Sequence, residues 1–107
     1  MRHLLLFGLL FSLFQTALYA GQLYGSVISG GRGVSASIEV DCGGAITRGG
    51  TQGDGSYRIN VPQQGKCTFT VLGYRGASTA VFSYGDPRQF DFNLEPRPDG
   101  SYELRGR

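Results

Sequence analysis

Residues 51–71 restrict the possible folds of this chain more than any other part of the sequence. Asp54-Gly55 is a strong turn signal, because glycine adopts positive φ without steric cost. Two series of alternating apolar residues follow this turn, with the two-residue period of half-buried strands. Their apolar members are Tyr57, Ile59 and Val61, then Cys67, Phe69 and Val71. Pro62 ends the first series and Gly65 begins a new turn, so the stretch predicts two consecutive strands.

The rest of the chain continues this pattern of short strands separated by glycine turns. Further strands are predicted at residues 22–29, 34–41, 45–48, 79–84 and 89–94. The inward residues of two of them are Ala36, Ile38 and Val40, and Phe90, Phe92 and Leu94. No helix-period pattern is present between these segments. The sequence therefore predicts an all-β fold, a small antiparallel sandwich of about seven strands, over residues 21–95.

The C-terminal tail, residues 96–107, has a different composition, with two prolines and mixed charge. Asp99-Gly100-Ser101-Tyr102 repeats the tetrapeptide Asp54-Gly55-Ser56-Tyr57. The tail is therefore expected either to be a loose segment or to add a short edge strand that pairs back on residues 89–94.

The first twenty residues have the pattern of a secretory signal peptide. Arg2 and His3 precede an apolar segment at residues 4–14, and small residues follow near Ala20. Cleavage is expected after Ala20, with Ala17 or Gly21 as alternative sites. The apolar segment is shorter than the roughly 20 residues of a membrane-spanning helix. The sequence thus predicts a periplasmic or secreted bacterial protein with no stable membrane anchor after cleavage.

The two cysteines of the chain, Cys42 and Cys67, both follow the predicted signal peptide. In an oxidising compartment such a pair favours a structural disulfide. Each cysteine shares the parity of the inward residues on its own strand, so both sulfurs are expected to point into the interior. A metal or redox pair is disfavoured, because no Cys-x-x-Cys spacing and no histidine partner exist here.

The charged residues exclude several classes of function. Residues 21–107 carry a net charge of about +1, whereas nucleic-acid modules are strongly basic on one face. The single histidine, His3, lies in the predicted signal peptide, which removes the commonest catalytic base and metal ligand. Glu39 and Asp41 are predicted on one exposed strand face, where paired carboxylates would allow a hydrolase; solvation is the favoured interpretation. We expect no catalysis, no metal and no cofactor.

The order of these motifs resembles the carboxypeptidase regulatory-like domain, a transthyretin-like β-sandwich related in architecture to immunoglobulin-like folds. The matching segments are Gly25-Ser26-Val27, residues 36–40, 51–57 and 61–74, and Asp91-Phe92-Asn93-Leu94. Cys67 occupies a position where the family usually has an aromatic residue. The resemblance implies a binding or spacer module rather than an enzyme.

Exposed aromatic residues are the remaining candidates for a binding surface. The candidate set comprises Tyr24, Tyr74 and Tyr84, with Arg75 and Arg88 as polar partners. Tyrosine and arginine are enriched where proteins contact other proteins, and tyrosine also stacks on sugars. The partner is therefore expected to be another envelope or extracellular protein; the alternative is a carbohydrate or other envelope polymer.

Overall fold

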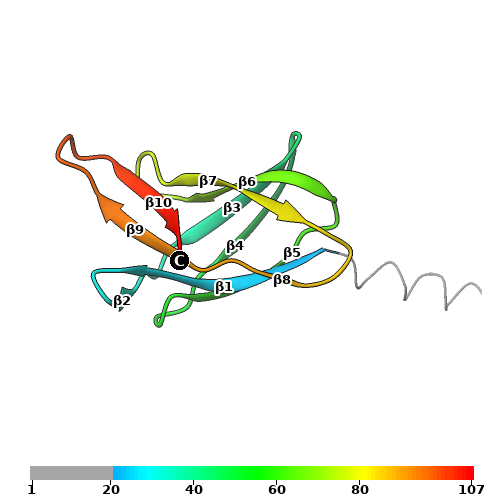
Figure 1. The fold of residues 1–107 in the computed structure, drawn as a ribbon, viewed down its shortest axis with the longest axis horizontal. Coiled ribbons are helices and arrows are strands. Elements are labelled where there is room, and N and C mark those ends of the chain that lie inside the picture. Colours follow the sequence, from blue (N-terminus) through cyan, green and yellow to red (C-terminus); the bar gives the residue numbers. More distant parts are fainter. Residues whose placement is uncertain (1–20) are drawn as a thin grey trace, which may run out of the picture.

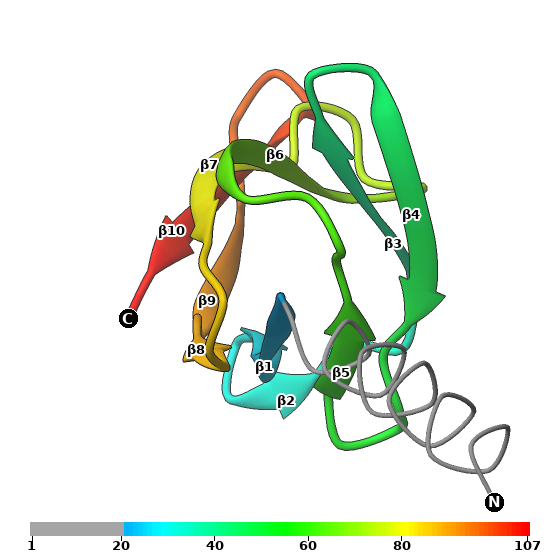
Figure 2. The ribbon, with the colours of Figure 1, turned by 90° about the vertical axis from the view of Figure 1, so that its right-hand side faces the viewer.

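The structure is a computed structural model that describes residues 21–107. These residues form two β-sheets packed against each other, as Figures 1 and 2 show from two directions. The predicted all-β fold and its sandwich arrangement are therefore confirmed. The predicted signal peptide at residues 1–20 lies outside the described residues. Within 21–107 no helix is long and apolar enough to cross a membrane.

The first sheet is built around its longest strand, β1. Its strands are β1 (Gln22–Ser29), β2 (Arg32–Gly33), β5 (Ser56–Asn60), β8 (Arg88–Gln89), β9 (Phe92–Pro96) and β10 (Tyr102–Gly106). On one side, β1 pairs antiparallel with β5 and then with β2. On the other side it pairs parallel with β8 and then with β9, and β10 adds antiparallel to β9. Strand β1 is thus a fully enclosed central strand.

The second sheet has the order β4-β3-β6-β7 and is antiparallel throughout. Its strands are β3 (Ser37–Cys42), β4 (Ala45–Gly50), β6 (Gly65–Val71) and β7 (Ser78–Ser83). Strands β4 and β7 are its two edges. Figure 2 shows β7 and β10 on one side of the sandwich and β4 and β5 on the other.

Alternate residues of both sheets fill the interior between them. The buried apolar residues are Leu23, Val27, Val34, Ile38, Val40, Tyr57, Ile59, Val61, Cys67, Phe69, Val71, Ala77, Val81, Phe92, Leu94 and Leu104. Phe69 of the second sheet is fully buried, and its ring centroid lies 5.1 Å from that of Tyr57 and 4.8 Å from that of Phe92. Both partners belong to the first sheet, so this aromatic cluster links the two layers. Truncating a buried phenylalanine to alanine costs about 3–5 kcal/mol.

Cys42 and Cys67 are joined by a disulfide, as the sequence predicts. The neighbouring register pair on β3 and β6 is Asp41 opposite Thr68, so the two cysteines face each other directly. Their Cα atoms are 4.3 Å apart. This separation matches the roughly 4.5 Å of an antiparallel pair that exchanges no backbone hydrogen bonds. The bond therefore staples the two central strands of the second sheet.

The repeated Asp-Gly-Ser sequence forms the same loop twice, at residues 52–56 and 97–101. In each loop the aspartate accepts hydrogen bonds from the amide and the hydroxyl of the serine two positions later. The distances are 3.0 and 2.7 Å at Asp54, and 2.9 and 2.6 Å at Asp99. The first residue of each loop also donates its amide to the serine carbonyl at 2.8 Å. The glycine between has φ of 85° and 87° respectively, a conformation that glycine adopts without strain.

The strand count and the pairing pattern differ from the sequence prediction. Ten strands are present in residues 21–107, because β2 and β10 are additional and the predicted strand at 89–94 is divided into β8 and β9. The division falls at Phe90, which is only partly buried at the margin of the core. The pairing of β1 with β8 and β9 is parallel, so the first sheet is mixed rather than antiparallel. Residue alternation predicts which face a residue occupies but not which strand lies beside it.

Two boundaries also shift for local reasons. Residues 34–36 lie outside β3, because the hydroxyl of Thr51 accepts the amide of Ala36 at 2.8 Å and also bonds the carbonyl of Val34. The C-terminal tail forms β10, whose residue Leu104 is buried against the core. Of the two alternatives for the tail, the edge strand is the one observed.

Candidate binding surface

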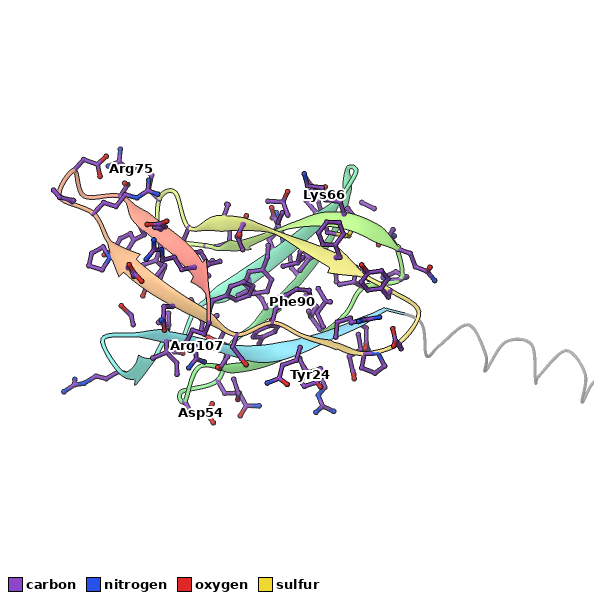
Figure 3. All side chains as sticks on the ribbon, viewed as in Figure 1. Tyr24, Asp54, Lys66, Arg75, Phe90 and Arg107 are labelled. Carbon is purple, nitrogen blue, oxygen red and sulfur yellow. A yellow bond between two sulfur atoms is a disulfide. The ribbon has the colours of Figure 1, made fainter. Side chains whose placement is uncertain are left out.

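The tyrosine and arginine candidates do not form one surface. Tyr74 and Arg75 lie in the loop before β7, whereas Tyr84 and Arg88 lie after it. A strand of six residues spans about 20 Å, so β7 separates the two pairs. Tyr24 belongs to β1 in the other sheet, and Figure 3 shows it well away from Arg75. Tyr24 is instead closer to Arg88, because β1 pairs with β8 and Tyr24 lies opposite Gln89. The predicted five-residue surface is therefore divided, with Tyr74 and Arg75 apart from the other three residues.

Tyr74 and Arg75 connect two loops of the molecule. The ring of Tyr74 packs edge-on against that of Tyr102, with centroids 5.0 Å apart and planes at 86°. The Arg75 guanidinium donates to the carbonyl of Asp99 at 3.2 Å, and the Arg75 carbonyl accepts the amide of Tyr102 at 2.8 Å. A shallow, open hollow is lined by Thr70, Val71, Leu72, Gly73, Tyr74, Arg75 and Gly76. Both candidate side chains are thus already engaged in holding β10 to the loop before β7.

Tyr84 and Arg88 are the more accessible pair. The side chain of Tyr84 is 44% exposed, and the Arg88 guanidinium lies 4.2 Å from its ring centroid. The Nε of Arg88 is also 3.3 Å from a carboxylate oxygen of Asp86. Two residues before Tyr84, Phe82 is 45% exposed. Phe82 and Tyr84 are the two exposed aromatic residues of residues 21–107.

The backbone of β7 near Phe82 also has peptide groups that are not bonded to β6. Hydrogen bonds join Val71 to Ala77 and Leu72 to Ser37, which fixes the alternation of bonded pairs across the sheet. By this alternation, the residues of β7 that bond to β6 are Thr79, Val81 and Ser83. The peptide groups of Ala80 and Phe82 then point away from β6, toward the free edge of the sheet.

The four outermost strands of the sandwich differ in what protects them. Charged side chains on an edge strand oppose pairing with another chain. Strand β4 carries Arg48, β5 carries Arg58, and β10 carries Glu103 and Arg105. Strand β7 (Ser78–Ser83) contains neither a charged residue nor a proline. It is the one edge of residues 21–107 without these protective features.

Sequence reasoning did not single out Phe82. Alternation along the predicted strand at residues 79–84 places Phe82 and Tyr84 on one face and Val81 on the other, and it does not decide which face is buried. Phenylalanine is usually buried, so the exposed position of Phe82 is not what its residue type predicts. The disulfide could have indicated the exposure of Phe82. Cys67 points inward, and directly paired residues on antiparallel strands share a face, so Val81 opposite Cys67 also points inward. The next residue, Phe82, must then point outward.

The acidic side chains and the buried phenol serve the fold. Hydrogen bonds from the Ser56 hydroxyl and amide lower the pKa of Asp54, and those from Ser101 do the same for Asp99. Tyr57 donates its hydroxyl to the carbonyl of Phe90 at 2.6 Å. Burial raises the pKa of Tyr57, and the nearby charge of Asp91 raises it further. These groups are committed to turns and to packing between strands.

Asp91 is the centre of a polar cluster. Its carboxylate accepts hydrogen bonds from the Ser26 hydroxyl at 3.2 Å and from the Gln89 amide at 2.9 Å. The Arg107 guanidinium donates to the Ser26 hydroxyl, and the Arg107 backbone amide donates to the Asp91 carbonyl at 2.8 Å. This cluster fastens the end of β10 to β1. Across residues 21–107, no three His, Cys, Asp or Glu side chains lie close enough to hold a metal ion.

No family model matches the chain, and no curated protein matches it. The resemblance to carboxypeptidase regulatory-like domains therefore depends on the motifs and on the strand order alone. The candidate surface that the geometry supports is the free edge of β7 with Phe82 and Tyr84, rather than the wider tyrosine set.

Proposed function

We propose that residues 21–107 form a non-catalytic, exported binding module that contacts another envelope or secreted protein. In this proposal residues 1–20 are a signal peptide, and the protein acts in the bacterial periplasm or outside the cell. Its seven-strand core is of the carboxypeptidase regulatory-like, transthyretin-like kind. The observation that carries the proposal is the outer edge of β7, a strand that contains no charged residue and no proline, with β10 close to part of it.

The mode of binding is the addition of a partner strand to that edge. An unpaired row of N–H and C=O groups needs only an extended peptide to complete the sheet. The outward peptide groups of Ala80 and Phe82 provide such a row, and the side chains of both residues are exposed. The backbone bonds would supply affinity. The exposed ring of Phe82 would supply selectivity, by favouring an aromatic or β-branched residue beside it on the partner strand.

The non-catalytic part of the proposal is supported by the state of the polar side chains. Residues 21–107 contain no histidine. Asp54 and Asp99 hold their own loops, and Glu39 is paired with Arg48 at 3.2 Å. The only hydroxyl that each aspartate faces is that of the serine in its own turn, and Glu39 faces an arginine, which keeps its proton.

Position-specific photocross-linking in the exported fraction tests strand addition directly. A benzoylphenylalanine in place of Phe82 is expected to yield a discrete adduct with one exported protein, identifiable by mass spectrometry. The substitution Ala80→Pro removes an outward N–H without touching the bonds to β6, so it should abolish the adduct. Ile46→Pro is the matched control, because the register gives Ile46 an outward N–H on the opposite edge strand, β4. The adduct should survive in the Ile46→Pro chain.

Equal adduct yields from cross-linkers at positions 46 and 82 would overturn the assignment to β7. Persistence of the adduct in the Ala80→Pro chain would overturn strand addition itself. Thermal melting of both proline variants checks that each still folds.

The second candidate function is binding of a carbohydrate or other envelope polymer, which the exposed ring of Tyr84 favours. Sugars stack on accessible aromatic faces, and Tyr84 is the most exposed tyrosine of the candidate set. A glycan array decides between the two functions. Binding that is lost in Tyr84→Ala and kept in Tyr74→Ala supports the glycan, because Tyr74 packs against Tyr102 rather than facing solvent. An array without signal for the parent chain removes this candidate.

A further inference from the structure

The C-terminal end of β7 carries a compact group of aromatic and basic side chains. We call Lys66, Phe82, Tyr84 and Arg88 the aromatic tip. Phe82 and Tyr84 are exposed by 45% and 44%, and Arg88 lies over the Tyr84 ring at 4.2 Å. Lys66 on β6 is the cross-strand partner of Phe82 and is also exposed. The acidic residue Asp86 is paired with Arg88, so the tip retains a positive charge from Lys66.

The described chain begins at the same end of the sandwich as this tip. Gly21 is buried, and its carbonyl accepts the amide of Val61. A Cβ on Gly21 would lie 3.2 Å from the hydroxyl of Ser83. Ser83 is adjacent to Phe82 and Tyr84 in sequence, but its side chain is buried on the opposite face of β7. Gly21 therefore lies on the core side of β7, at the same end of the strand as the aromatic tip. Arg75, by contrast, lies at the opposite end of the molecule in Figure 3.

The sequence before Gly21 determines how far the tip can be from a lipid bilayer. Residues 4–14 are almost entirely apolar, and only residues 15–20 separate them from Gly21. Six fully extended residues span about 20 Å. Whenever the apolar segment is inserted in a membrane, the tip is therefore held within about that distance of the lipid surface.

The composition of the tip suits that location. Aromatic rings with a polar or cationic neighbour are enriched at the headgroup level of membranes. Lysine and arginine add attraction to anionic lipids, and their aliphatic stems tolerate the apolar boundary. We propose that the aromatic tip is a contact site for an anionic lipid surface, occupied while residues 1–20 are attached to the domain. In this orientation the C-terminal end of β7 faces the membrane surface.

This contact is independent of strand addition along the β7 edge. The lipid contact uses side chains at the end of the strand, whereas the affinity of strand addition comes from the backbone; the two share only the ring of Phe82. A failure of one therefore leaves the other intact, and the two are measured by different readouts.

Tryptophan fluorescence tests the orientation, because the chain contains no tryptophan. The full chain, residues 1–107, is incorporated into phosphatidylcholine vesicles with and without phosphatidylglycerol, and with a doxyl-labelled lipid as quencher. The chain carrying Phe82→Trp is compared with a chain carrying Leu72→Trp. Leu72 is similarly accessible, at 37%, but follows the other end of β6. Both sites are exposed, so neither substitution disturbs the core.

We expect quenching in the Phe82→Trp chain to exceed that in the Leu72→Trp chain by about twofold or more, and to increase with phosphatidylglycerol. Adding Lys66→Gln and Arg88→Gln should remove the dependence on phosphatidylglycerol. Equal quenching at the two positions, or none at position 82, would overturn the proposal. A signal at position 82 that responds to exported proteins but not to vesicles would assign the tip to a protein partner instead.

Discussion

The disulfide offers the sharpest quantitative test of this structure. Cys42 and Cys67 are 25 residues apart in sequence, and their bond closes that loop in the unfolded chain as well as in the folded one. In the chain-entropy model a loop of this length stabilises the folded state by about 3.5 kcal/mol. Small domains have a total stability of about 5–15 kcal/mol, so the bond represents a large share.

Reduction and substitution separate the two contributions of the cysteines. Reduction breaks the cross-link but leaves both sulfur atoms in place, whereas Cys42→Ala/Cys67→Ala also removes the buried sulfur of Cys67, which is 2% exposed. Reduced protein should therefore lose about 3.5 kcal/mol. The double alanine variant should lose about 1 kcal/mol more for the space left in the core. For a domain of this size each kcal/mol corresponds to about 4–8 °C in Tm.

Guanidinium unfolding of the oxidised, reduced and double-alanine proteins measures these differences. The slope of the transition should also increase on reduction, because the unfolded chain without its cross-link exposes more surface. A reduced protein whose stability lies within about 1 kcal/mol of the oxidised one would refute the loop-closure reasoning. So would a lower midpoint that appears only in the alanine variant, because packing of the sulfur would then be the whole effect.

Two further predictions concern the first sheet. Gly55→Ala should destabilise the fold by about 1–3 kcal/mol, because its φ is positive and a Cβ there would collide with the carbonyl of Val27. Gly53→Ala is the control, because a Cβ at Gly53 would have no other atom within 4 Å. It should change stability by about 0.5 kcal/mol or less in the same denaturation assay. Tyr57→Phe should cost about 1 kcal/mol at neutral pH through its lost bond to Phe90. The raised pKa of Tyr57 means that its stabilising effect is present below about pH 10 and declines as pH rises above it. Stability curves of the parent and Tyr57→Phe chains should therefore converge at alkaline pH, and parallel curves there would contradict the assignment.

Local sequence patterns predict much of this fold, because they report which face of a strand is buried. The alternation of Phe92 with Leu94, and that of Cys67 with Phe69, correctly indicates inward positions in both sheets. The Asp54-Gly55 turn is predictable for the same reason, since its geometry depends on adjacent residues alone. The disulfide follows from parity once Cys42 and Cys67 are placed on neighbouring strands.

Features that depend on distant partners could not be predicted in the same way. The parallel arrangement of β1 with β9 requires knowing where the chain crosses between sheets, and no local pattern around Phe92 contains that information. The exposure of Phe82 depends on the register between β6 and β7. Strand β10 has a single buried apolar residue, Leu104, which is too little to distinguish a strand from a loose tail.

The covalent link between Cys42 and Cys67 lies wholly inside the second sheet. Strands β1 and β10, which lead to the two ends of the described chain, both belong to the first sheet. Mechanical tension applied at those ends would therefore reach the unlinked layer before the linked one. In a single-molecule pulling experiment, the first sheet should peel away as one event, and the stretch of chain between the two cysteines should contribute no length until a reductant is added.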